Sequence, residues 1–356
     1  MNKKRLEMII SNMKNHDIDQ MIITSPDSIF YLLNEWIHPG ERMLALYINS
    51  NGFTKLFNNK LFPLSDIGTK VCYYDDTEDP IKKLASVIDE TKIMGIDKNW
   101  PSSFLIKLLN ETNNLKVVDS SIVVDETRMI KDKEEIKLMK KASEVNDKVM
   151  KKALDLVKKG LSEQEIGKKL ADVYAEYNTP NFSFDPLICF GKNAAEPHHS
   201  SDDTKLSENE CIIIDIGGIT NNYSSDMTRS FFNGTPSKEY KKIYNLVLKA
   251  NLKAIEKVKP GVKFSDIDNT ARDIIKEGGY GEYFIHRTGH NIGICAHEYP
   301  DVSSVNDMEV KEGMVFSIEP GIYIPGKYGV RIEDLVIVTK DGCEVINKYP
   351  KDLRTF

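Results

Sequence analysis

The chain has 356 residues, enough for two ordinary domains, and 40% of them are apolar and 29% charged, which is a usual globular balance. Its 54 acidic side chains outnumber the 48 basic ones, and a net charge of −6 argues against nucleic acid binding as the main activity. The five cysteines are scattered and form no CxxC pair, and the amino-terminal stretch does not resemble a secretory signal. No run of about 20 apolar residues is present to span a membrane. These features predict a cytoplasmic protein.

The first third of the chain alternates between helical and strand-like patterns. Helices are predicted at 4–15, 80–92 and 101–110, and strands at 21–24, 43–48, 70–74, 93–96 and 116–118. This alternation predicts a small α/β domain that covers residues 1–125.

Residues 126–356 have a different texture and form a second predicted domain. Helices are predicted at 131–159, with a break or bend before Gly160, and at 161–177, 238–258 and 264–277. Apolar strands are predicted at 186–190, 211–216, 314–318 and 330–338. Ser162 followed by Glu165 is a capping box for the second helix. Paired helices and clustered strands favour an α+β domain with a curved, largely antiparallel sheet.

Carboxylates stand at the ends of apolar strands in this second domain. Asp215 closes the run that begins at Cys211 and contains three consecutive isoleucines, and Asp226 follows eleven residues later. A turn through residues 217–222 would fold the two segments into a hairpin and bring the aspartates together. An isolated buried carboxylate is very costly, so each of these side chains requires a partner.

Two glutamates repeat the pattern further along the chain. Glu319 follows the strand at 314–318, and Glu333 shares one face of the strand at 330–338 with Arg331. Any one such acid alone is more often a cap or a salt-bridge partner, but four on apolar strands would repel one another unless cations neutralise them. Oxygen-rich sites suit divalent metals, and a histidine widens the choice to Mn, Fe, Co or Zn. Five of the seven histidines lie in this domain: His198, His199, His286, His290 and His297.

Taken together, these segments resemble the metallopeptidases of the pita-bread fold, which include prolidase, aminopeptidase P and methionine aminopeptidase. The family's ligand order of Asp, Asp, His, Glu, Glu is matched by Asp215, Asp226, His290 in Gly-His-Asn-Ile-Gly, Glu319 in Glu-Pro-Gly, and Glu333 in Arg-Ile-Glu-Asp. The resemblance is strong over residues 126–356 and weak before them. It implies a creatinase-like amino-terminal domain followed by a pita-bread catalytic domain.

The resemblance also implies roles for the site residues. Two divalent metal ions per chain are expected, with manganese favoured and cobalt, zinc and iron left open. Glu319 is the expected proton shuttle, and His198 and His297 are expected to hydrogen-bond the substrate carbonyl or the tetrahedral intermediate. The expected substrate-binding residues are His286, Tyr323 and Arg331, of which Arg331 would either hold a substrate carboxylate or orient Glu333 and its neighbours.

The implied reaction is hydrolysis of the bond before proline, and several relatives compete. Prolidase, which acts on Xaa-Pro dipeptides, is favoured; aminopeptidase P, which acts on longer peptides, is the alternative, and a non-catalytic binding protein of the same fold is the third. Methionine aminopeptidases generally lack the amino-terminal domain, and creatinase has lost metal ligands. The resemblance further implies a homodimer in which the loop 36–42 reaches over the partner's active site.

Overall fold

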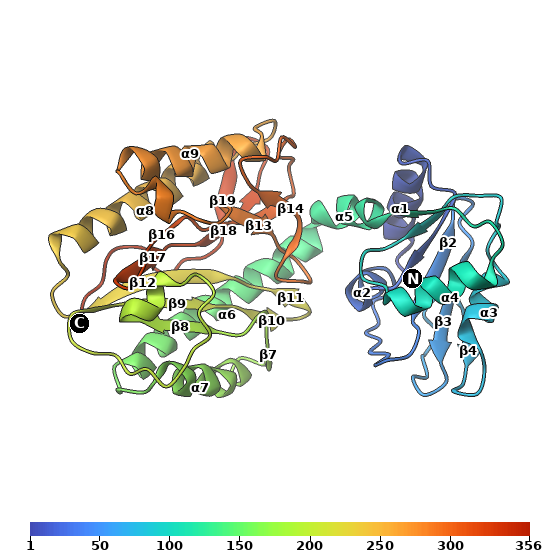
Figure 1. Cartoon of the computed structure of the whole chain (residues 1–356), viewed down its shortest axis with the longest axis horizontal. Coiled ribbons are helices and arrows are strands. Elements are labelled where there is room, and N and C mark those ends of the chain that lie inside the picture. The colour runs from blue at the N-terminus through green and yellow to red at the C-terminus, as the bar shows by residue number, and fades with distance from the viewer. The chain divides into compact units, whose positions relative to one another are not determined.

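The computed structural model describes residues 1–356 and divides them into two compact units, Met1–Arg128 and Met129–Phe356 (Figure 1). The division falls three residues beyond the boundary drawn from the sequence at 125. None of the helices combines the length and the apolar character needed to cross a bilayer. No disulfide joins the five cysteines.

The amino-terminal unit is built on one mixed sheet of six strands in the order β4-β3-β2-β1-β5-β6. Its elements are α1 (Lys3–Asn15), β1 (Gln20–Ile23), α2 (Pro26–Leu33), β2 (Ala45–Asn49), β3 (Thr54–Asn59), β4 (Lys70–Tyr74), α3 (Pro80–Ala85), β5 (Met94–Ile96), α4 (Ser102–Glu111), β6 (Val117–Asp119) and α5 (Ser121–Met129). Strand β1 pairs antiparallel with β2 and parallel with β5, so it lies at the centre of the sheet.

Four parts of this unit differ from the prediction, and one of them is helix α5, for which no element was predicted. Helix α3 ends at Ala85 instead of continuing to 92, because the chain then tightens into turns in which Val87 and Ile88 donate to carbonyls three residues back. Helix α2 was not predicted, since nearly all of its side chains are buried and the sequence shows no polar face. Strand β3 was missed because it ends in Asn58 and Asn59, which are buried here.

The loop 36–42 is ordered by contacts within its own unit. The ring of Trp36 stacks on Phe30 with centroids 4.5 Å apart, and His38 stacks on Trp36 at 5.8 Å. The Arg42 guanidinium donates to Asp76 at 2.7 Å.

The second unit places strands between two pairs of helices, as Figure 1 shows. Its elements are α6 (Lys133–Val157), α7 (Glu163–Ala175), β7 (Asn181–Phe182), β8 (Leu187–Phe190), the 3-10 helix η1 (Gly191–Ala195), β9 (Glu210–Ile216), β10 (Gly218–Thr220), β11 (Tyr223–Ser224), β12 (Met227–Asn233), α8 (Lys238–Lys257), α9 (Phe264–Glu277), η2 (Gly281–Tyr283), β13 (Gly289–Asn291), β14 (Glu298–Val302), β15 (Val315–Ile318), β16 (Gly321–Ile324), β17 (Tyr328–Arg331), β18 (Asp334–Val338) and β19 (Cys343–Val345).

The run of isoleucines in β9 is explained by its two covered faces. Cys211 and Ile213 belong to the core that contains α8 and α9, whereas Ile212 and Ile214 belong to the core that contains α6 and α7. Successive side chains of a strand point to opposite faces, so a strand covered on both sides needs apolar residues at every position. All strand pairs of the unit are antiparallel, which confirms the predicted α+β architecture.

The helices of this unit follow their sequence signals closely. Helix α9 has the predicted bounds, and α7 begins with the predicted capping box of Ser162 and Glu165. Helix α6 has its own capping box, between Asp132 and Glu135, and it ends at Val157, so the helix breaks before Gly160 as predicted.

The strand predicted at 330–338 is wrong as a single element. The chain forms β17 in a two-stranded ribbon with β16, breaks at Ile332 and Glu333, and enters the five-stranded sheet as β18. At the break the amide of Glu333 donates to the carbonyl of Thr228, a residue of β12, at 3.1 Å. This contact joins the break at Glu333 to strand β12 of the neighbouring sheet.

Candidate functional site

The two aspartates are brought together by pairing of β9 with β12. Thr228 lies opposite Asp215 and Met227 lies opposite Ile216, which places Asp226 just beyond the paired residues. The connecting segment forms a smaller hairpin of β10 and β11, whose two-residue turn is Asn221–Asn222 with φ of 50° and 68°. Positive φ at both positions is the geometry of a type I′ turn, which asparagine tolerates. The predicted hairpin is therefore present, with this second hairpin at its tip.

The remaining three candidate ligands come from adjacent strands of the five-stranded sheet. Glu319 follows β15 and Glu333 precedes β18, and these strands pair with Ile318 opposite Asp334. His290 lies on β13, the other neighbour of β15. The strand ends thus direct two glutamates and one histidine to the same place.

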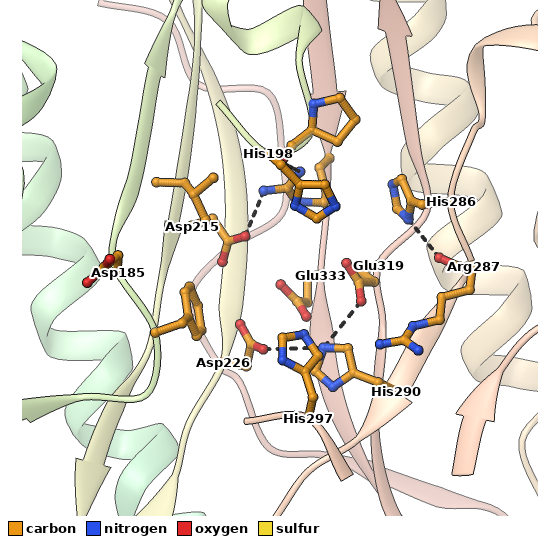
Figure 2. Close-up of a pocket in the computed structure, with 14 residues that line it drawn as sticks. Asp185, His198, Asp215, Asp226, His286, Arg287, His290, His297, Glu319 and Glu333 are labelled. Carbon is orange, nitrogen blue, oxygen red and sulfur yellow. Dashed lines mark hydrogen bonds and ion pairs between the residues drawn. The ribbon is translucent and has the colours of Figure 1, made fainter. Parts of the chain in front are cut away.

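All five candidate ligands line one cavity of about 500 Å³ (Figure 2). The His290 Nε2 atom lies 3.6 Å from Asp226 Oδ2 and 3.4 Å from Glu319 Oε1. Asp226, His290 and Glu333 each offer a ligand atom within 4.8 Å of the other two. Asp215 faces the same cavity, although its Oδ2 accepts a hydrogen bond from Arg331 at 2.6 Å.

His290 is oriented as a ligand. Its Nδ1 lies 3.2 Å from the carbonyl of Asn291, to which it can only donate, so the lone pair of Nε2 faces the carboxylates. Burial, reinforced by the neighbouring His297, lowers the pKa of His290 to about 3. The imidazole is therefore neutral at neutral pH, as metal ligation requires.

Three carboxylates of the cavity are buried close to one another, and both effects raise their pKa values. Burial is the main cause that raises the pKa of Glu319 to about 7 and the pKa of Asp226 and Glu333 well above their ordinary values, and for Asp226 the charges of Glu333 and Asp215 come next. Asp215 Oδ1 and Glu333 Oε1 are buried without any hydrogen-bond partner. Carboxylate oxygens with an imidazole nitrogen form a donor set for hard or borderline divalent ions, so these residues fit a metal centre.

Arg331 is hydrogen-bonded to Asp215 and to residues that surround the candidate ligands. Its buried guanidinium donates to Asp215 Oδ2, to Thr228 Oγ1 at 3.0 Å through Nε, and to the Tyr323 hydroxyl at 2.9 Å through Nη1. The Thr228 hydroxyl in turn donates to Glu333 Oε2 at 2.7 Å. Of the two roles considered for Arg331, these contacts favour orientation of the carboxylates. Thr228 was not identified from the sequence, because only the fold shows that it links Arg331 to Glu333.

The other predicted residues divide into two groups. His198, His286 and His297 line the cavity together with Arg331, whereas Tyr323 is buried and does not line it. The Tyr323 hydroxyl accepts from Arg331 and donates to His286 Nε2 at 2.9 Å, since His286 Nδ1 donates to the carbonyl of Arg287 at 2.7 Å. Burial lowers the pKa of His286 to about 4.

The cavity also contains residues that the sequence did not identify. Arg287, which Figure 2 labels in the cavity, is the important one, because its side chain is 41% exposed and its nearest acidic partner, Asp301, is 4.0 Å away. Its position directly after His286 was the available signal. The remaining unpredicted lining residues are Phe184, Asp185, Leu187 and Pro197.

Comparisons with known proteins agree with this geometry. Residues 137–340 match the model of metallopeptidase family M24, and residues 5–130 match the creatinase/prolidase N-terminal domain. An uncharacterized peptidase of Staphylococcus epidermidis is 39% identical over 351 residues, which are 98% of this chain and 99% of the relative. A recombinant prolidase from Thermococcus sibiricus is 34% identical with a TM-score of 0.94, covering 100% of this chain and 99% of that one. An Xaa-Pro dipeptidase from Bacillus anthracis is 30% identical with a TM-score of 0.90, covering 99% of each chain. The chain therefore belongs to metallopeptidase family M24 and is a peptidase with a creatinase/prolidase N-terminal domain.

Proposed function

We propose that the chain is an Xaa-Pro dipeptidase that binds two divalent metal ions in this cavity. The expected ligands are Asp215, Asp226, His290, Glu319 and Glu333. The observation that carries the proposal is the convergence of these five donors on one cavity, where two buried carboxylate oxygens have no partner within the chain. The resemblance to solved structures described as a prolidase and an Xaa-Pro dipeptidase supports the substrate class.

The residues of the cavity can carry out the proton transfers of such a reaction. Divalent ions held there would supply Lewis acidity, which lowers the pKa of water and polarises a carbonyl. Glu319 retains 17% side-chain exposure, so it can take the proton of the attacking water and deliver it to the proline nitrogen. That nitrogen belongs to a tertiary amide without an N–H, and it must gain a proton to leave as an amine.

His198 and His297 are assigned to the carbonyl oxygen. Both line the cavity, and no hydrogen bond within the chain occupies either imidazole. A donor aimed at the oxygen as its negative charge develops stabilises the transition state more than the ground state. His286 is assigned a supporting role, because Tyr323 and the carbonyl of Arg287 already occupy both of its ring nitrogens.

We assign the substrate carboxylate to Arg287 rather than to Arg331. All three nitrogens of Arg331 already donate, to Asp215, Thr228 and Tyr323, so a substrate carboxylate would have to compete with these acceptors. Arg287 lines the same cavity with its side chain partly exposed. A dipeptide ending in proline presents a free carboxylate directly after the scissile bond, whereas a longer peptide presents a neutral amide there.

The test compares an Xaa-Pro dipeptide with the matching Xaa-Pro-Yaa tripeptide on the metal-loaded enzyme. A charge-assisted contact is worth about 1.5–3 kcal/mol, so kcat/KM for the dipeptide should exceed that for the tripeptide by at least about tenfold. Arg287→Ala should reduce this preference, while Arg354→Ala, at a partly exposed arginine paired with Asp352, should leave it unchanged. Equal cleavage of both peptides would instead identify an aminopeptidase P. Failure to bind stoichiometric metal, together with no hydrolysis of either peptide, would identify a binding protein of this fold.

A further inference from the structure

The two histidines assigned to the carbonyl oxygen both lie outside regular secondary structure. His198 follows η1 in a turn, and His297 lies in the bend before β14. No hydrogen bond within the chain holds either imidazole. The His297 ring packs on His290 with centroids 4.1 Å apart, but the orientation of both rings still depends on the backbone that carries them. Catalytic side chains need to be held within a fraction of an ångström, and the support must come from other residues.

The residue that follows His198 supplies one such support. His199 Nε2 lies 2.9 Å from Glu163 Oε2, and the Glu163 side chain is fully buried at the start of α7. The same carboxylate accepts the amide of Phe190 at 2.7 Å, the side chain of Asn193 at 3.0 Å and the amide of Asp202 at 3.1 Å. One buried group thus ties together both ends of the segment that carries His198.

These contacts distinguish the cluster from a second metal site. Glu163, His199 and Asp202 lie close enough together to hold a cation. Both oxygens of Glu163, however, already accept N–H donors from four different residues, two of them backbone amides. The arrangement is that of a hydrogen-bonded anchor, because a cation at the carboxylate would have to displace these donors.

The residue that follows His297 makes an equivalent contact. Glu298 Oε2 lies 3.2 Å from Lys131 Nζ, and the two side chains are 7% and 1% exposed. Its other oxygen accepts the amides of Ile294 at 3.0 Å and Cys295 at 3.2 Å. Gly293 closes the bend, since a Cβ there would lie 2.8 Å from Glu298 Oε2. The segment that presents His297 is therefore folded around one nearly buried carboxylate.

We propose that Glu163–His199 and Lys131–Glu298 are two positioning pairs. The first holds His198, and the second holds His297, in position to contact the peptide carbonyl. This inference rests on the proposed function of His198 and His297. In each dipeptide the histidine lines the cavity, whereas the residue after it does not line it and is held by a buried partner. A displacement of a reacting group by about 1 Å lowers the rate by on the order of 10²-fold.

Variants of His199 test the first pair. His199→Phe keeps an aromatic ring at this position but removes the N–H donor, and the other donors to Glu163 remain to hold the fold. We expect kcat to fall by about 30- to 100-fold while KM and metal content change by less than about threefold. His199→Gln should restore most of the rate, because its amide nitrogen can stand where Nε2 stands.

A double-mutant cycle separates positioning from general destabilisation. His199→Phe should lower kcat in the wild type but cause no further loss in a His198→Ala background, whereas Lys131→Met should still lower it there. With His297→Ala the pattern should reverse. Glu298→Gln and the conservative Lys131→Arg provide a second pair if Lys131→Met does not fold. Lys140→Met, which breaks the half-exposed pair with Glu344, is the matched control and should have no effect.

Hydrogen exchange gives a readout that is independent of activity. His199→Phe should speed exchange of the amides at 190–202 and leave those at 293–298 unchanged, and Lys131→Met should do the opposite. The proposal would be overturned if His199→Phe lowered kcat equally in the wild-type and His198→Ala backgrounds. A wild-type kcat in His198→Ala, or unchanged hydrogen exchange in both segments, would also overturn it. The cycle is measured with whichever peptide the enzyme cleaves fastest, so an error in the proposed substrate class would appear as a different preferred peptide and leave the cycle readable.

Discussion

Replacement of Thr228 by valine tests whether the Thr228 hydroxyl holds Glu333 in place for metal binding. Thr228 is fully buried; its Oγ1 donates to Glu333 Oε2 at 2.7 Å and accepts from Arg331 Nε at 3.0 Å. Valine has nearly the same shape, so the change removes both hydrogen bonds with little effect on packing. Because the other oxygen of Glu333 has no partner, the variant leaves this carboxylate without a hydrogen bond from a side chain.

The expected loss follows from the kind of bond removed. A hydrogen bond to a charged group contributes about 1.5–3 kcal/mol, which corresponds to roughly a tenfold to hundredfold weaker affinity for metal. Competition with a chelator of known affinity measures this on the metal-free protein, and Thr228→Ser, which keeps the hydroxyl, is the control. Metal affinity in Thr228→Val equal to that of the wild type would refute the assignment of Thr228 as a support for Glu333.

Three further outcomes are expected. Glu319→Gln should lower kcat by at least about 10²-fold while metal stays bound, because an amide oxygen can coordinate but cannot accept the proton; a rate within tenfold of the wild type would exclude Glu319 as the shuttle. Metal analysis should find two ions per active chain, and chelation should abolish activity that manganese restores best; full activity after exhaustive chelation would contradict this. Light scattering should give twice the mass of one chain, and a fully active monomer at assay concentration would rule out a site shared between subunits.

The helices could be predicted well because their signals are local. The capping box at Ser162 and the bounds of α9 depend on residues within one or two turns of each other. The break at Glu333 could not be predicted in this way, since β17 and β18 read as one apolar run and only the pairing with different neighbours separates them. The same limit explains why α2, which is buried on nearly every side, shows no periodic pattern.

The candidate site, too, was predictable only in part from the sequence. The resemblance to a known family identified the order of the five candidate ligands, and the structure gathers all of them around one cavity. The resemblance did not show that all three nitrogens of Arg331 are hydrogen-bonded or that Arg287 is the more exposed cation, because both facts depend on the folded structure. Thr228 reads from the sequence as an ordinary strand residue, and only its two hydrogen bonds distinguish it.

The separation of the ligands along the chain has a consequence for biosynthesis. Arg331 and Asp215 meet although 116 residues separate them, and neither hairpin holds more than two of the candidate ligands on its own. Contacts between such distant segments form late in folding, because the loop between them must first be closed. An incomplete or misfolded chain would thus present only scattered carboxylates. On the proposed function, tight uptake of metal would act as a checkpoint that only the finished domain passes, and binding at that point would stabilise the contacts that formed last.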